Sequence, residues 1–120
     1  LLELVGIAAV ADDYPSAVPL GYLKCLELAR ALALEPELIL LDEPLAGLNQ
    51  AEAAQMADRI ASLVTESRSI ILIEHNLREV VRIYPELFVQ DHGRYLDFGA
   101  TEEVMANPKV RAAYLGEGAI

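Results

Sequence analysis

The stretch LILLDEPLAGLN, residues 38–49, runs from four apolar residues straight into two adjacent carboxylates, Asp42 and Glu43. The apolar run is short and has a proline on either side, which predicts a strand buried on both faces, as in a parallel sheet. Two interpretations are open: the carboxylates hold a group that offsets their charge, or they are the ordinary polar end of a strand. The choice depends on what else the chain brings to the same place.

The residues after this stretch predict a strand, helix, strand unit. Asn49, with Glu52 three residues later, has the pattern of a capping box that begins a helix. The apolar stripe expected for that helix comprises Ala53, Met56, Ala57, Ile60, Leu63 and Val64. The segment SIILIE, residues 69–74, predicts a second buried strand, and a helical connection of this length makes the two strands parallel. The predicted fold class is therefore α/β with a parallel βαβ core.

The chain on either side of this core also divides into short elements. Before it, we expect a short amphipathic helix over residues 1–8, a proline-containing loop, and a helix over residues 20–34. After it, we expect a helix that starts at residue 77, a β-hairpin whose turn is DHG at residues 91–93, and two short helices. The last of these helices is expected to end at Gly116.

Composition excludes several classes of function. The 120 residues suffice for one domain at most, and 54% of them are hydrophobic, yet no apolar run reaches the roughly 18 residues of a membrane span. The N-terminus lacks the basic flank of a signal peptide, so we expect a cytoplasmic protein. A formal net charge of −10, without a cluster of Lys and Arg, argues against nucleic acid as a partner. The lone Cys25 has apolar neighbours and is expected to be a buried hydrophobe.

Four ionisable side chains are expected at one edge of the predicted sheet. Asp42 and Glu43 follow the first strand, and Glu74 and His75 follow the second. The carboxyl ends of parallel strands lie at the same edge, which is where open α/β sheets bind ligands. Each pair alone is a weak signal, but their combination indicates a site.

Three segments together resemble the C-terminal half of the ATP-binding subunits of ABC transporters. They read LELARALALEPELILLDEPLAGLN, ILIEHNLREV and DHGRYLDFGATEEVMANPKVRAAYLG. The last segment is most similar to the branch that takes up branched-chain amino acids. The resemblance implies a partial P-loop NTPase fold of the ABC ATPase type, in two parts. Residues 1–35 would be a remnant of the helical subdomain, and residues 36–120 the C-terminal part of the ATPase core.

The resemblance also implies roles for single residues. Asp42 is similar to the Walker B aspartate, which holds Mg²⁺, usually through water. Glu43 is similar to the catalytic glutamate that polarises the attacking water, and His75 to the switch histidine that contacts the γ-phosphate. Gly21 and Asn49 lie in segments similar to loops of the interface in the nucleotide-sandwich dimer. ATP and Mg²⁺ are therefore the cofactors implied for a complete family member.

The chain departs from the family pattern at the sites that bind phosphate. No G-x-x-x-x-G-K-[ST] occurs, so the Walker A loop and its strand are missing, and we expect the chain alone to bind neither ATP nor Mg²⁺. The family signature before LELARAL appears as VPLGY, residues 18–22. Only Gly21 remains in its usual place, and Pro19 has neither a hydroxyl nor an N–H to donate.

The missing strand has a structural consequence. It would leave a hydrophobic edge on residues 70–74. The chain is therefore expected to pair its hairpin across the gap, to self-associate through that edge, or to need the missing half. The first residue, Leu1 rather than methionine, indicates a chain that begins within a gene.

Three functions remain open at this point. The first is a fragment of a transporter ATPase that, when complete, hydrolyses ATP to drive import of a solute such as branched-chain amino acids. Its partners would be transmembrane permease subunits and a second ATP-binding subunit, on the cytoplasmic face of the membrane. The second is a non-catalytic pseudo-ATPase module that packs on a partner subunit. The third, a chromosome-maintenance ATPase, is disfavoured by the acidic composition and the transporter-like tail. The sequence does not name the solute.

Overall fold

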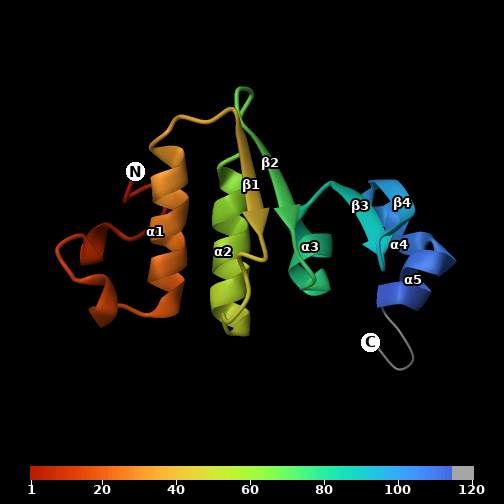
Figure 1. The fold of residues 1–120 in the computed structure, drawn as a ribbon, viewed down its shortest axis with the longest axis horizontal. Coiled ribbons are helices and arrows are strands. Elements are labelled where there is room, and N and C mark those ends of the chain that lie inside the picture. The colour runs from red at the N-terminus through yellow and green to blue at the C-terminus, as the bar shows by residue number, and fades with distance from the viewer. Residues whose placement is uncertain (115–120) are drawn as a thin grey trace. The chain divides into compact units, whose positions relative to one another are not determined.

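The computed structural model describes residues 1–114, so the helix end expected at Gly116 lies outside the described part. Its contacts divide the chain into two compact units, Leu1–Asn76 and Leu77–Ile120, and each is described by itself. The first unit contains a parallel strand pair with two long helices, and the second contains a β-hairpin with three short helices (Figure 1). The division at residues 35 and 36 implied by the family resemblance stays a prediction.

The first unit begins with a single helical turn, not with the helix expected over residues 1–8. The amide of Ile7 donates to the carbonyl of Leu2 at 2.9 Å and that of Gly6 donates to Glu3 at 3.1 Å, a pair of bonds that closes a helical turn. Gly6 has a φ of +77°, which ends the helix because this left-handed conformation suits glycine. Two 3₁₀ turns follow, at Ala8–Val10 and Pro15–Ala17.

The two long helices of the first unit have 13 residues each. They are α1, Leu20–Leu32, and α2, Gln50–Ser62, and they pack side by side (Figure 1). The predicted capping box at the start of α2 is confirmed by both of its hydrogen bonds. The apolar stripe is confirmed except at Val64, which lies after the helix end and is 53% exposed. Cys25 is fully buried as expected, and its sulfur accepts a hydrogen bond from Arg59 at 3.1 Å.

The two parallel strands are β1, Leu38–Asp42, and β2, Ser69–Ile73, and the predicted βαβ unit is thus confirmed. The expectation that β1 is buried on both faces is wrong for this chain. Ile39 is 4% exposed, whereas its neighbour Leu40 is 68% exposed, and Ile71 on β2 is 55% exposed. One face of the pair rests on the core of the unit and the other is open, because nothing in the first unit covers it.

The second unit is built on the predicted antiparallel hairpin. Helix α3, Leu77–Ile83, precedes the strands β3, Glu86–Asp91, and β4, Arg94–Ala100. The turn residues with positive φ are His92 and Gly93, rather than Asp91, which still belongs to the strand. This matches the two-residue turn that the twist of a hairpin favours.

Two short helices cover one face of the hairpin. They are α4, Thr101–Ala106, and α5, Pro108–Tyr114. The core between them and the strands consists of Leu87, Val89, Val104 and Val110. The opposite face carries an aromatic group that is more than half exposed, comprising Phe88, Tyr95 and Phe98. The described strands form two separate two-stranded sheets, β1 with β2 and β3 with β4.

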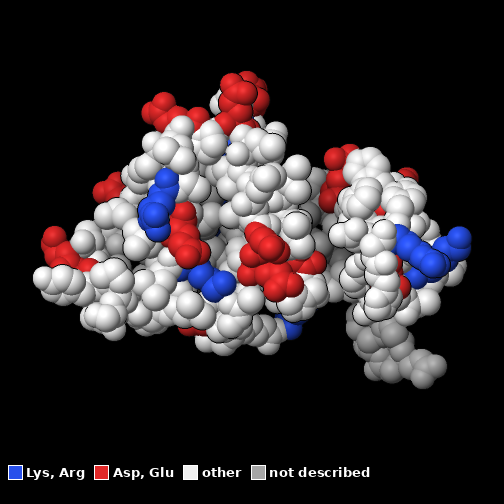
Figure 2. Space-filling model, viewed as in Figure 1, with Lys and Arg blue, Asp and Glu red and all other residues white. Residues whose placement is uncertain are grey.

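The described surface follows the charge of the sequence. On the face in Figure 2, Asp and Glu side chains occur in several groups, while Lys and Arg side chains are few and lie apart from one another. Such a face offers no basic track for a phosphate backbone. Among residues 1–114, no helix combines the length and the apolar character needed to cross a bilayer.

Candidate functional site

The predicted site residues meet at one end of the parallel strand pair. In the register of the sheet, Asp42 on β1 lies opposite Ile73 on β2, so the residues that follow both strands emerge at the same edge. The amide of Glu43 donates to the carbonyl of Ile73 at 2.7 Å, which extends the ladder by one bond beyond β1. The structure therefore brings together Asp42, Glu43, Glu74 and His75, which lie about 30 positions apart in the chain.

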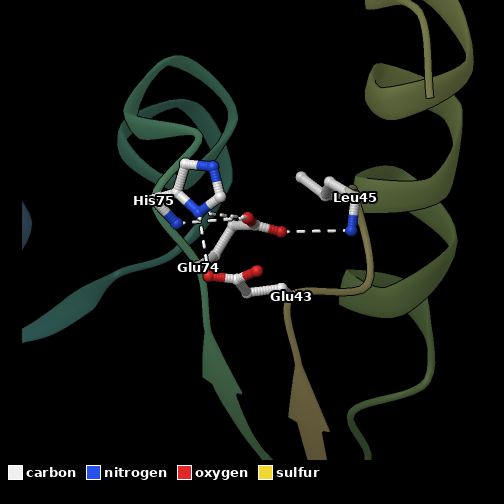
Figure 3. A network of polar contacts seen from close by, with 4 residues as sticks. All are labelled: Glu43, Leu45, Glu74 and His75. Atoms are coloured by element: carbon white, nitrogen blue, oxygen red, sulfur yellow. Dashed lines mark hydrogen bonds and ion pairs between the residues drawn. The ribbon is translucent and has the colours of Figure 1, made fainter. Parts of the chain in front are cut away.

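Glu43 and His75 are in direct contact. Oε1 of Glu43 lies 3.1 Å from Nδ1 of His75, and the two side chains are 50% and 69% exposed (Figure 3). The backbone of Glu43 has a φ of +48°, a conformation that residues other than glycine seldom adopt. It lets the chain leave β1 in a tight turn, in which the amide of Ala46 donates to the carbonyl of Glu43 at 3.2 Å.

Glu74 is the buried member of the group. Its side chain is 1% exposed, and it points from the end of β2 toward the turn that follows β1 (Figure 3). Oε2 accepts a hydrogen bond from the amide of Leu45 at 3.1 Å, and Oε1 accepts one from the amide of His75 at 3.1 Å. A buried carboxylate needs such partners, because the loss of water around a charge is costly.

Asp42 is exposed at the end of β1, which leaves its carboxylate accessible to a ligand. Among residues 1–114, no three side chains of His, Cys, Asp or Glu are grouped so that they could hold a metal ion by themselves. The single carboxylate of Asp42 still fits Mg²⁺ that is bound together with a nucleotide. Mg²⁺ is commonly held by one or two carboxylates while water and phosphate oxygens supply the other ligands.

The other two predicted residues, Gly21 and Asn49, lie in segments that approach each other. Gly21 is in the first turn of α1, and a Cβ placed on it would lie 3.9 Å from the side chain of Leu48. A Cβ on Gly47 would lie 2.9 Å from Leu20, so the loop before α2 packs closely on the start of α1. The side chain of Asn49 accepts from the amide of Glu52 at 2.9 Å and is thus engaged in capping α2.

Sequence reasoning missed two features of this region. It placed Glu74 at the edge without a role, although an acidic residue directly before a strand-end histidine was visible in SIILIEH. It also did not identify Pro19 as the N-cap residue of α1. Pro19 takes that position with extended backbone and no side-chain capping bond, because its side chain has no hydrogen-bond acceptor.

The chain is similar to several known proteins. A family model described as "Branched-chain amino acid ATP-binding cassette transporter" matches residues 99–120. The high-affinity branched-chain amino acid transport ATP-binding protein LivG of Escherichia coli K12 is 38% identical over 117 residues, or 97% of this chain and 46% of LivG. The lipopolysaccharide export system ATP-binding protein LptB of Haemophilus influenzae is 32% identical over 117 residues, or 98% of this chain and 48% of LptB.

A solved structure shows the same fold. The ADP conformation of MJ1267, an ATP-binding cassette of an ABC transporter, superposes with a TM-score of 0.84 at 28% identity, over 97% of this chain and 47% of MJ1267. The chain belongs to the ATP-binding subunits of ABC transporters and corresponds to their C-terminal part. It spans about half the length of the curated relatives it matches.

Proposed function

We propose that this chain supplies the water-activating part of a cassette that hydrolyses ATP to drive the import of a solute. The observation that carries the proposal is the contact of 3.1 Å between Glu43 and His75 at the carboxyl edge of the sheet, next to the exposed Asp42. A carboxylate and an imidazole in hydrogen-bond contact can orient a water molecule and respond to a phosphate placed beside them.

Each of the three residues would have a distinct role. Asp42 would hold Mg²⁺ through water, and the bound ion would neutralise part of the charge on the β- and γ-phosphates. Glu43 would orient the attacking water and accept its proton, since half of its side chain is open to solvent while Oε1 is held by His75. His75 would contact the γ-phosphate through the exposed side of its ring.

The substrate class is proposed from the relatives. The printed name of LivG assigns it to high-affinity branched-chain amino acid transport, and the family model with the same substrate in its description matches residues 99–120. We therefore propose branched-chain amino acids as the transported class. The proposed partners are transmembrane permease subunits and a second ATP-binding subunit, with the cassette at the cytoplasmic face of the membrane.

The open face of the strand pair supports the proposal that another part of a complete cassette packs against it. Leu38, Leu40, Ile71 and Ile73 are 49–68% exposed, whereas parallel sheets are normally covered on both faces. The curated relatives are about twice as long as the segment they share with this chain. We propose that the remainder of such a cassette covers this face, and that the isolated chain otherwise self-associates through it.

The test is a chimera in which this chain replaces the matching region of E. coli LivG. ATP turnover by the chimera should fall about 100-fold or more on Glu43→Gln, because the water-orienting carboxylate is lost. Glu66→Gln is the matched control, since Glu66 is an exposed acidic residue in the turn before β2. Turnover that is equal in the two variants would exclude Glu43 from the reaction.

A second function is favoured by one specific observation, the proline at the N-cap of α1. In the family the corresponding segment grips the nucleotide of the partner subunit, and Pro19 can donate no hydrogen bond there. This chain would then be a non-catalytic module that packs on a partner subunit. A chimera that folds and binds nucleotide but turns over ATP only after Pro19→Ser would favour this second function.

A further inference from the structure

We propose that Glu74 is a positioning residue whose buried carboxylate holds Glu43 and His75 in register, an inference that rests on the proposed function of that pair. Glu74 does not face solvent and is not placed to contact a substrate. It bridges the backbone on both sides of the site, and it does so from the end of β2 (Figure 3).

The carboxylate of Glu74 is buried. With 1% of its side chain exposed, Glu74 has almost no water to solvate its charge, so its partners must come from the protein. Each oxygen has one backbone donor, Leu45 for Oε2 and His75 for Oε1, both at 3.1 Å. Hydrogen bonds to a charged acceptor are stronger than neutral ones, which suits them to fixing a loop.

The two backbone donors to Glu74 lie on the two segments that carry Glu43 and His75. Leu45 lies two residues after Glu43 and is 3% exposed. Its amide therefore lies on the buried side of the turn that carries Glu43. His75 directly follows Glu74, and its backbone amide donates to Oε1 of Glu74. One carboxylate therefore ties together the backbones that carry both members of the pair.

The contact between Glu43 and His75 is too weak to fix its own geometry. Glu43 and His75 are 50% and 69% exposed, and ion pairs between exposed side chains contribute little, since water and salt screen them and both side chains lose freedom. The geometry at 3.1 Å then needs a separate fixed support. The backbone bond from Glu43 to Ile73 joins the two strand ends, and the bonds of Glu74 add a second link, from a buried position, to the turn beyond Glu43.

The two carboxylates also bear on which nitrogen of His75 carries the hydrogen. Its Nδ1 lies 3.1 Å from Oε1 of Glu43 and 3.8 Å from Oε1 of Glu74. The first distance is that of a hydrogen bond and the second is too long for one, so Nδ1 carries the hydrogen in its contact with the carboxylate of Glu43. The nearby charge of Glu74 favours the same tautomer, in which Nε2 of the neutral ring is left as an acceptor on the other side.

The test uses nuclear magnetic resonance on the 120-residue chain, at one mildly alkaline pH for every variant. In the unmodified chain, the amides of Leu45 and His75 should exchange slowly with solvent, and the ¹⁵N shifts of His75 should report hydrogen on Nδ1. In Glu74→Gln, protection of both amides should fall about tenfold or more, as expected for loss of a charge-assisted bond. The population of the Nδ1–H tautomer should fall with it.

Two matched variants complete the design. Glu74→Asp keeps the charge but shortens the side chain by one methylene, so it should not restore both bonds at once. Glu66→Gln, on an exposed turn, should leave both amides and the tautomer unchanged. A purely structural role would change stability without shifting the tautomer of His75.

The outcomes separate this inference from the proposed function. Rapid exchange of the Leu45 and His75 amides in the unmodified chain would overturn the role of Glu74, and that measurement needs no variant to fold. An Nδ1–H population that Glu74→Gln leaves unchanged would do the same. Neither result involves ATP, so an inactive LivG chimera would count against the proposed function alone.

Discussion

The open face of the strand pair can be tested by two substitutions on adjacent residues of β1. Ile39 is 4% exposed and Leu40 is 68% exposed, although both are large apolar residues on the same strand. Truncation of a buried Leu or Ile to Ala costs about 2–5 kcal/mol, from lost burial and from the cavity left behind. Ile39→Ala should therefore reduce the free energy of unfolding by about 3 kcal/mol. Only about a third of Leu40 is covered, so Leu40→Ala should reduce the free energy of unfolding by about 1 kcal/mol.

The assay is urea denaturation followed by circular dichroism at low protein concentration. Each variant replaces one strand residue by Ala, so the change in β-propensity is similar and the difference reports burial. Equal losses for the two variants would mean that the Leu40 face is covered in solution, which contradicts the open face. A Leu40→Ala loss that grows with protein concentration would identify a second copy of the chain as the cover.

The site and the start of α2 can be tested in the same way. The isolated 120-residue chain should show no ATP turnover above background in a coupled phosphate-release assay, because the Walker A loop is missing. Glu43→Gln should therefore leave its turnover unchanged. Measurable turnover that Glu43→Gln abolishes would contradict this prediction. In the LivG chimera, His75→Ala should slow turnover, and an unchanged rate would remove His75 from the site. Asn49→Ala should lower the free energy of unfolding by about 1 kcal/mol through loss of the capping box, measured by urea denaturation. Gln55→Ala, an exposed change inside the same helix, is its control and should be near neutral; a similar loss in both variants would mean that the cap contributes little.

The sequence predicted the elements that local signals encode. The short apolar strand, the Asn49 cap and the hairpin were all found where the pattern placed them, because each depends on a few neighbouring residues. The prediction of a first helix was wrong, and the cause is again a local one. Apolar spacing favoured a helix over residues 1–8, but Gly6 ends the first turn with a left-handed backbone.

Burial was harder to predict than secondary structure. An apolar run tells which residues prefer to be covered, but it does not tell whether a covering element is present in the same chain. β1 has the composition of a strand buried on both faces, yet Leu40 lies in the open. The roles of Asp42, Glu43 and His75 stay predictions, because their chemistry depends on a nucleotide and on a Walker A loop that this chain does not contain.

By itself, the sequence determined that two strands end in carboxylates and a histidine, and that a capped helix joins those strands. Only the tertiary structure decided that Glu43 meets His75 at 3.1 Å and that Glu74 is buried beneath them with one amide on each oxygen. The physical reason is that strand register and the path of the turn after β1 set these distances. Both are fixed by packing between segments about 30 residues apart, and no local pattern records that packing.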